Sequence, residues 1–255
     1  MNPCSIVDLG LIPYGEAWEL QKRVVAARKA DAIEDVLLFC EHRHVITLGR
    51  SGNRANLLAS ESVLRQKGVE YFETIRGGDI TYHGPGQIVG YPILNLGAIR
   101  RDVVWYVRTL EEAMIRATAD LGIAARREDG KTGIWVDTPQ RIATQSSQSA
   151  QGKEETTEKL AAIGVHISRW VTSHGFAYNV ATDLRYFELI VPCGITDRKA
   201  TSLEKLLGRQ VSLEEIRALL AKHVCDVFGL TIRTEEAAEL LAKLAEFEQA
   251  LAVSA

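Results

Sequence analysis

The chain has 255 residues, of which 46% are apolar and 25% charged, and its formal net charge at pH 7 is −3. This length and composition are ordinary for a globular protein with a sizeable core, and the slightly acidic balance does not indicate a nucleic-acid partner. No apolar run approaches the ~20 residues that span a bilayer. The N-terminus also lacks the basic and apolar segments of a signal peptide. We therefore expect a cytoplasmic protein with no membrane partner.

Cysteine spacing argues against a metal site and against a disulfide framework. The four cysteines are far apart and form no CxxC pair; they are Cys4, Cys40, Cys193 and Cys225. We expect free thiols, and neither a metal nor another bound cofactor.

The first half of the chain predicts short strands and helices. Apolar residues at helical spacing predict a helix over residues 14–30 and another over 102–121, which Gly122 ends. Between these helices, residues 35–42, 44–50 and 69–75 are rich in β-branched and aliphatic residues and predict strands. The more polar residues 61–68, which end at Gly68, predict a helix.

The second half predicts three further strands. They cover residues 131–136, 160–167 and 173–180. The segment between the first two is rich in Ser, Thr, Gln and charge and has no periodicity, so we expect an exposed loop near 138–157.

The C-terminal part predicts helices. Thr201 with Glu204, and Ser212 with Glu215, have the spacing of capping boxes. We expect the last helix to form a tail near 234–255. Several strands follow one another without a helix between them, which favours one α+β domain over residues 1–255, with a mixed sheet flanked by helices.

The segment RGGDITYHGPGQIVGYPILNL, from Arg76 to Leu96, places five glycines and two prolines around His83. It is not a P-loop, which requires GxxxxGK[ST]. It is also not a GxGxxG turn that opens a helix, because the residues after Gly86 predict an apolar strand. We therefore expect a wall of glycine backbone against which a ligand lies. The glycines are Gly77, Gly78, Gly84, Gly86 and Gly90.

Cys193 is the cysteine whose surroundings are most suggestive of chemistry. It stands between Pro192 and Gly194 in VPCGIT, a tight turn that would present its sulfur at the edge of a site. The alternative is a small buried apolar side chain, which is the usual role of a lone cysteine. Cys40 in a strand and Cys225 on a helix are interpreted as core residues, and Cys4 as incidental.

A nucleophilic cysteine needs a neighbouring cation or base, since an unperturbed thiol with a pKa of ~8.5 is mostly protonated at neutral pH. The candidates are His83 and His174, each followed by glycine, and Lys159 at the end of the polar segment. The alternative for Lys159 is an ordinary solvated lysine. The remaining histidines are interpreted as structural or surface residues: His42, His44, His166 and His223.

Three motifs in this order resemble the lipoyl(octanoyl) transferase family: RGGDITYHGPGQIVGYPILNL, EKLAAIGVHISRWVTSHGFAYNV and VPCGIT. The segments EHRHVITLGR and KTGIWV are similar to the same family, so the resemblance covers residues 14–228. The family resemblance implies a fold related to those of biotin protein ligases and lipoate ligases.

The resemblance implies octanoyl transfer from acyl carrier protein, through a cysteine thioester, to a lysine of the lipoyl domains of 2-oxoacid dehydrogenases and of the glycine-cleavage H protein. Cys193 resembles the nucleophile, and Lys159 resembles the lysine that lowers the pKa of its thiol. Three segments resemble the acyl-substrate pocket. They contain Arg76, Gly77, Gly78, Asp79, Ile80, Thr81, Tyr82 and His83; Ala162, Ile163 and Gly164; and Gly175, Phe176 and Ala177. We expect a monomer.

With this resemblance, we expect the glycines to remove side chains from one wall of an acyl slot. Backbone amides near Gly77, Gly78, Gly164 or Gly175 are candidates for stabilising the charge that develops on the thioester oxygen. Lys159 or His83 is the candidate base for the attacking amine. Other functions remain open. They are an ATP-dependent lipoate or biotin ligase, a non-catalytic protein that binds acyl carrier or lipoyl domains, and a cysteine hydrolase.

Overall fold

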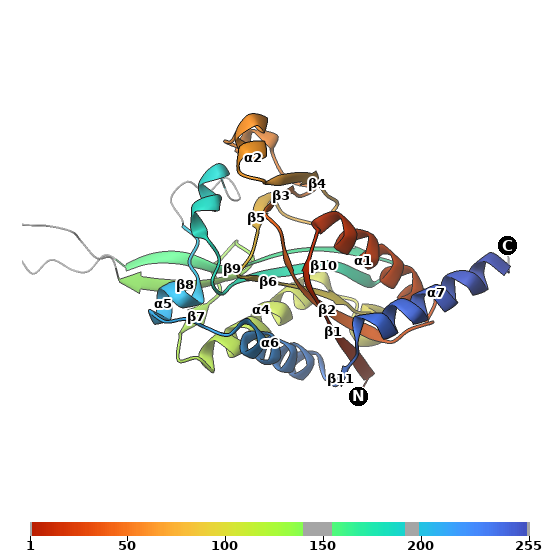
Figure 1. Ribbon diagram of the computed structural model, residues 1–255. Helices are drawn as coiled ribbons and strands as arrows, with labels where there is room; N and C mark the ends of the chain where they lie inside the picture. Colours follow the sequence, from red (N-terminus) through yellow and green to blue (C-terminus); the bar gives the residue numbers. More distant parts are fainter. Residues whose placement is uncertain (1, 140–154, 192–198, 254–255) are drawn as a thin grey trace, which may run out of the picture.

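A computed structural model describes residues 2–139, 155–191 and 199–253 (Figure 1). Its largest element is an eight-stranded mixed sheet with the order β11-β1-β2-β6-β10-β9-β8-β7. The β1 strand pairs in parallel with β2 and β11, and all other neighbours are antiparallel. The strands are β1 (Asn2–Ile12), β2 (Asp35–His42), β6 (Gln87–Ile93), β7 (Ala125–Arg126), β8 (Ile134–Pro139), β9 (Glu155–Ser168), β10 (Val171–Asn179) and β11 (Leu230–Thr234).

A second sheet has three strands in the order β4-β3-β5. They are β3 (Val45–Leu48), β4 (Glu70–Glu73) and β5 (Ile80–His83). The glycine-rich segment therefore crosses from one sheet to the other, since β5 belongs to the small sheet and β6 to the large one. The helices are α1 (Tyr14–Lys29), α2 (Glu61–Gln66), α3 (Leu96–Ile99), α4 (Val103–Ala119), α5 (Leu203–Leu207), α6 (Leu213–Phe228) and α7 (Ala237–Val253), with 3₁₀ turns η1 (Arg54–Asn56) and η2 (Leu184–Leu189).

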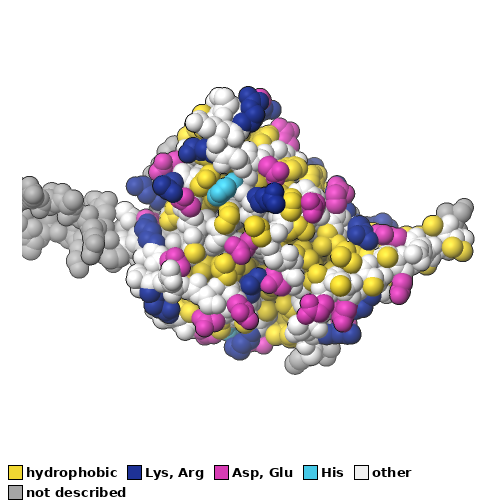
Figure 2. Space-filling model, viewed as in Figure 1, with side chains coloured by type: hydrophobic (Ala, Val, Ile, Leu, Met, Phe, Trp, Pro, Cys, Tyr) yellow, Lys and Arg dark blue, Asp and Glu magenta, His cyan; other side chains and the backbone are white. Residues whose placement is uncertain are grey.

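Helices cover both faces of the large sheet (Figure 1). The side chains of β2 alternate between the faces, as the pleat of a strand requires: Leu37 and Phe39 join the core beneath α4 and α6, whereas Val36, Leu38 and Cys40 join the core beneath α1 and α7. This arrangement agrees with the predicted mixed sheet flanked by helices. Figure 2 shows acidic and basic side chains interspersed on one face of the molecule, with no basic patch. In the described part of the chain, every helix is too short or too polar to cross a bilayer.

Two predictions near the ends of elements are wrong. The predicted loop near 138–157 begins and ends as strand, because β8 extends to Pro139 and β9 starts at Glu155, with Thr138 opposite Thr156. The middle of that loop lies outside the described residues. Ser202 and not Thr201 caps α5, since its hydroxyl accepts the Lys205 N–H.

Strands β1 and β11 were not predicted, and therefore the position of Cys4 in a strand was not predicted either. Cys4 is fully buried in the core beside Cys225 on α6, so its interpretation as incidental is wrong. Cys40 and Cys225 are buried, as predicted. Ser212 caps α6 through the Glu215 N–H, as predicted, and Gly229 ends that helix in the left-handed conformation.

Candidate active site

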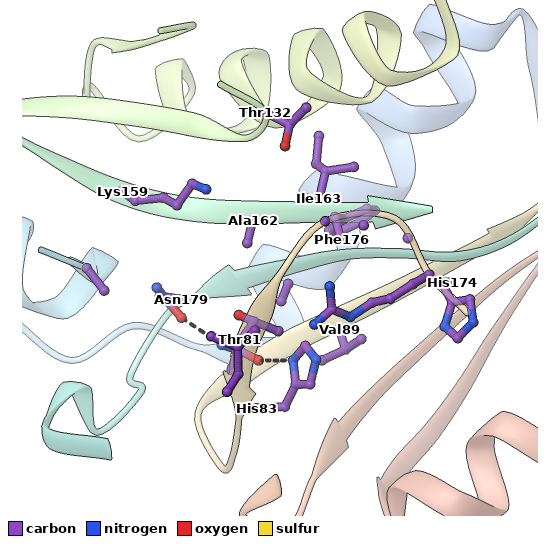
Figure 3. A pocket seen from close by; sticks show the side chains of 18 of the residues that line it. Thr81, His83, Val89, Thr132, Lys159, Ala162, Ile163, His174, Phe176 and Asn179 are labelled. Carbon is purple, nitrogen blue, oxygen red and sulfur yellow. Dashed lines mark hydrogen bonds between the residues drawn. The ribbon is translucent and has the colours of Figure 1, made fainter. Parts of the chain in front are cut away.

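A pocket lies where the glycine-rich segment crosses between the two sheets, on the α1 side of the large sheet (Figure 3). It gathers thirteen of the predicted site residues from β5, β9, β10 and the loop before β5. They are Arg76, Gly78, Asp79, Ile80, Thr81, His83, Lys159, Ala162, Ile163, Gly164, Gly175, Phe176 and Ala177. The second and third acyl-pocket segments, which lie on adjacent strands, thus meet the first one in space.

Two of the predicted pocket residues do not line it. The side chain of Tyr82 is fully buried in the small sheet's core, where its ring stacks on Tyr186 and its hydroxyl bonds His44 Nδ1 at 2.7 Å. Gly77 is tied to β9, since its N–H donates to Val165 O at 2.8 Å. Because the Gly77 N–H already donates this hydrogen bond, it is no longer a candidate for stabilising a thioester oxygen.

The position of Lys159 depends on a β-bulge. Ala161 lies opposite Ile134, but Lys159 lies opposite Trp135, so Leu160 is the extra residue in β9. A bulge shifts the alternation of side chains by one residue. Leu160 and Ala161 consequently both enter the core under α4, and Lys159 reaches the same pocket as Ala162.

The side chain of Lys159 is half-buried, and its Nζ lies 4.8 Å from the centre of the Trp135 ring, a cation–π contact. Its backbone is also fixed: the Lys159 N–H donates to Lys199 O at 2.8 Å, and Lys159 O accepts the Thr201 N–H at 2.9 Å. Lys199 and Ala200 line the pocket as well. The described chain that follows VPCGIT is therefore anchored beside Lys159, whereas Cys193 itself lies outside the described residues.

Gly164 and Gly175 line the pocket and also lie where two backbone segments approach each other closely. A side chain at Gly164 would place its Cβ 2.8 Å from Gly77 O, and one at Gly175 would place its Cβ 2.0 Å from Gly90 O. Both distances are too short, so these glycines allow backbone segments to approach each other and do not make room for a ligand. The wall of glycine backbone was predicted for the segment 76–96, and of its five glycines only Gly78 lines the pocket, so that prediction is largely wrong. The apolar side chains around the pocket include Val89, Ala162 and Ala177.

His83 belongs to a buried hydrogen-bond network (Figure 3). Gln87 Nε2 donates to Asn179 Oδ1 at 2.9 Å and to Tyr82 O at 3.3 Å, so Gln87 Oε1 faces His83 Nδ1 at 2.8 Å and accepts a hydrogen bond from its N–H. Burial, and then the nearby His42, lower the pKa of His83 to about 3. His83 is thus neutral at pH 7 and poorly suited to take a proton from an amine, which disfavours it as the base.

Two further histidines next to this network are also neutral. Burial lowers the pKa of His42 to about 4, while its Nδ1 bonds Ile12 O at 2.9 Å and its Nε2 bonds the Tyr91 hydroxyl at 2.7 Å. Burial and the Arg76 guanidinium lower the pKa of His174 to about 3. Neither is therefore a cation that would stabilise a thiolate, and the half-buried lysine remains the better candidate.

Arg76 holds the loop before β5 in place. Its Nη2 donates to Thr47 O at 2.6 Å and to Thr47 Oγ1 at 2.9 Å, and its Nη1 donates to Gly77 O at 3.0 Å. The guanidinium is buried, and it also lines the pocket. It joins the glycine-rich loop to β3 and places a fixed positive charge beside the histidines.

Several lining residues were not predicted as such. Gln87, Val89 and Tyr91 alternate along β6 and so share the face of this strand that lines the pocket. Trp135 stands in the predicted strand KTGIWV, opposite Lys159. No local pattern indicates the others, which tertiary packing brings to the pocket: Tyr14, Thr132, Asn179, Phe187, Lys199 and Ala200.

The model of the lipoyl protein ligase A/B catalytic domain family matches residues 13–225, and the chain belongs to this family. It is 48% identical to an octanoyltransferase of Solibacter usitatus over an alignment of 228 residues. The alignment covers 89% of this chain and 94% of the relative. It is 45% identical to an octanoyltransferase of Acidobacterium capsulatum over an alignment of 255 residues. That alignment covers 96% of this chain and 98% of the relative. The predicted resemblance to octanoyltransferases is thus confirmed over most of the chain.

Solved structures share the fold. A bipartite lipoate protein ligase from Thermoplasma acidophilum superposes with a TM-score of 0.70 at 15% identity, covering 96% of this chain and 91% of that one. A lipoate-protein ligase A bound with ATP gives a TM-score of 0.69 at 18% identity, covering 96% and 93%. The predicted relation of the fold to lipoate ligases is therefore confirmed, and at these identities the likeness concerns the fold alone.

Proposed function

We propose that this protein transfers an octanoyl group from acyl carrier protein to a lysine of lipoyl domains, with Cys193 as the nucleophile and Lys159 as its activating residue. The observation that carries the proposal is the half-buried Lys159, which the bulge in β9 turns into a largely apolar pocket. The acceptor proteins are the lipoyl-domain proteins of 2-oxoacid dehydrogenases and the glycine-cleavage H protein. Octanoyltransferase relatives at 45–48% identity support the same activity.

In the first step, the Cys193 thiolate attacks the carbonyl carbon of the octanoyl thioester. The C–S bond to the carrier breaks, and the carrier thiolate leaves and takes a proton from solvent. Lys159, no longer beside a thiolate, gives a proton to solvent and becomes neutral. Lys159, as an ammonium, stabilises the Cys193 thiolate before the attack. Burying the methylenes of the octanoyl chain between Val89, Ala162 and Ala177 stabilises the complex by ~0.8 kcal/mol for each CH₂.

In the second step, the acceptor lysine attacks the Cys193 thioester. Its side chain has an ordinary pKa of ~10.4 and gives one proton to solvent before the neutral amine reacts. Neutral Lys159 accepts the second proton as the amide forms, since the depressed pKa of His83 makes the histidine a poor base. The amide forms as the C–S bond breaks, and Cys193 leaves as the thiolate with which the cycle began.

The proposal is tested by supplying the acyl group in two chemical forms to the same lipoyl domain. Octanoyl-acyl carrier protein without ATP is expected to add one octanoyl group to the domain, as measured by intact mass. A lipoyl domain whose acceptor lysine is replaced by arginine serves as the control and should gain nothing. Modification that occurs only with free octanoate and ATP would instead identify an adenylating ligase, and no modification in either mixture would contradict acyl transfer altogether.

A further inference from the structure

The turn at residues 53–59 joins the pocket loop to the chain that precedes Cys193. On the pocket side, its anchor is the Asp79 carboxylate, the last member of the RGGD segment. Asp79 Oδ2 accepts a hydrogen bond from Asn56 Nδ2 at 2.5 Å, and Asp79 Oδ1 accepts the Asn53 N–H at 3.1 Å. Although Asp79 lines the pocket, both of its carboxylate oxygens are thus used to hold this turn.

On its other side, the same turn binds the end of η2 and the residues after it. Asn56 O accepts the Val191 N–H at 2.7 Å, and the N–H groups of Leu58 and Ala59 donate to Leu189 O at 2.9 and 3.2 Å. Leu57 and Ile190 form an antiparallel bridge. Residues 189–191 are thus paired to the turn by backbone hydrogen bonds as a strand is paired to its neighbour.

The backbone around Asp79 leaves little freedom for its carboxylate to move. Gly49 N–H donates to Asp79 O at 3.2 Å, and Arg50 N–H donates to Arg76 O at 2.8 Å. A Cβ at Gly52 would lie 2.8 Å from Asp79 Oδ1, so the chain before the turn packs directly on the carboxylate. A fixed acceptor therefore sets the position of Asn56, and the Asn56 carbonyl sets the position of Val191.

We propose that Asp79 and Asn56 are positioning residues, which hold residues 189–191 in register with the pocket and so set the starting point of the chain that carries Cys193. Val191 precedes Cys193 by two residues in the sequence. The inference rests on the proposed role of Cys193 as nucleophile. A displacement of reacting groups by about 1 Å can cost a hundredfold in rate, so a small shift of this anchor affects the chemistry without unfolding the protein.

The test exchanges donor and acceptor between the two residues. Asn56→Asp alone places two carboxylates at the distance of a hydrogen bond, and their repulsion should displace the turn. Adding Asp79→Asn restores one donor and one acceptor in the reverse order, and leaves an amide oxygen for the Asn53 N–H. Asp79→Asn alone keeps an acceptor without its charge and serves as the milder variant. Arg54→Ala changes an exposed side chain of the same turn and is the matched control.

Two measurements separate positioning from folding. The first is the rate of single-turnover octanoylation, followed by intact mass. The second is the pH dependence of alkylation by iodoacetamide, which reports on Cys193 because Cys4, Cys40 and Cys225 are buried. Asn56→Asp is expected to slow octanoylation at least tenfold and to move the apparent thiol pKa toward ~8.5. The double variant should return to within about threefold of the wild-type rate, and Arg54→Ala should match wild type.

Wild-type octanoylation and an unchanged alkylation profile in Asn56→Asp would overturn the inference. So would a double variant as impaired as the single one while both melt at the same temperature. Failure of wild type to become octanoylated would contradict the proposed function instead, and the alkylation profiles would still show whether the turn positions the thiol.

Discussion

Replacing Lys159 by methionine is expected to slow octanoylation of Cys193 about tenfold at pH 7.5, and octanoyl transfer onward to the lipoyl domain by at least about a hundredfold. Without a nearby ammonium, a thiol of ordinary pKa ~8.5 is about 90% protonated at this pH, which accounts for the first loss. Loss of a positioned base costs 10²–10⁴ in rate and accounts for the second. Quenched single-turnover reactions, read by intact mass at each time point, measure the two steps separately.

Lys159→Arg is the matched control because it keeps the positive charge but cannot lose it at this pH. The arginine variant should become octanoylated at nearly the wild-type rate and then stall as the acyl-enzyme. If the methionine variant completed both steps at wild-type rates, Lys159 would be an ordinary solvated lysine and its place in the pocket would be incidental. Equal losses in both steps for both variants would indicate damage to the bulge rather than to the chemistry.

The second large effect is expected from Ala162→Leu. Ala162 points into the pocket from β9 (Figure 3), and leucine adds three carbons in the space where we place the acyl chain. Displacing about three methylenes costs ~2.4 kcal/mol, which corresponds to about fiftyfold in kcat/KM for an octanoyl donor. A butanoyl donor, which is four carbons shorter, should lose no more than about threefold by the same reasoning. Steady-state rates with the two donors measure this ratio.

Ala161→Leu provides the control, since Ala161 is the neighbouring residue and is buried in the core on the opposite face. Overpacking there should lower the melting temperature, yet leave the ratio of octanoyl to butanoyl rates unchanged. The placement of the acyl chain would be contradicted if Ala162→Leu slowed both donors equally or slowed neither.

The fold was largely predictable because most of its elements have local patterns. The apolar run of β2 and the caps of α6 are visible in the sequence, and the structure reproduces them. Strand β1 was missed because Pro3 and Gly10 interrupt its pattern, and its two parallel partners lie about 30 and 230 residues further along the chain. Pairing at such separations has no local signature.

The candidate site was predictable as a set of segments but not as a set of side-chain directions. Tyr82 belongs to the RGGDITYH motif, and yet the pleat of β5 turns it into the small sheet's core. Lys159 reaches the pocket only because of the bulge at Leu160, which depends on the register of β8 and β9. The glycines of residues 76–96 were interpreted as a wall for a ligand, whereas a Cβ at Gly86 would meet the Ala181 carbonyl and one at Gly90 would meet the Phe176 ring.

The central claim is that the acyl group passes through Cys193, and intact mass after incubation with octanoyl-acyl carrier protein tests it most directly. The proposed mechanism predicts that wild type gains one octanoyl group, that Cys193→Ala gains none, and that an added lipoyl domain removes the group from wild type without ATP. An octanoyl group on Cys193→Ala, or octanoylation of the lipoyl domain by that variant at the wild-type rate, would contradict the thioester mechanism.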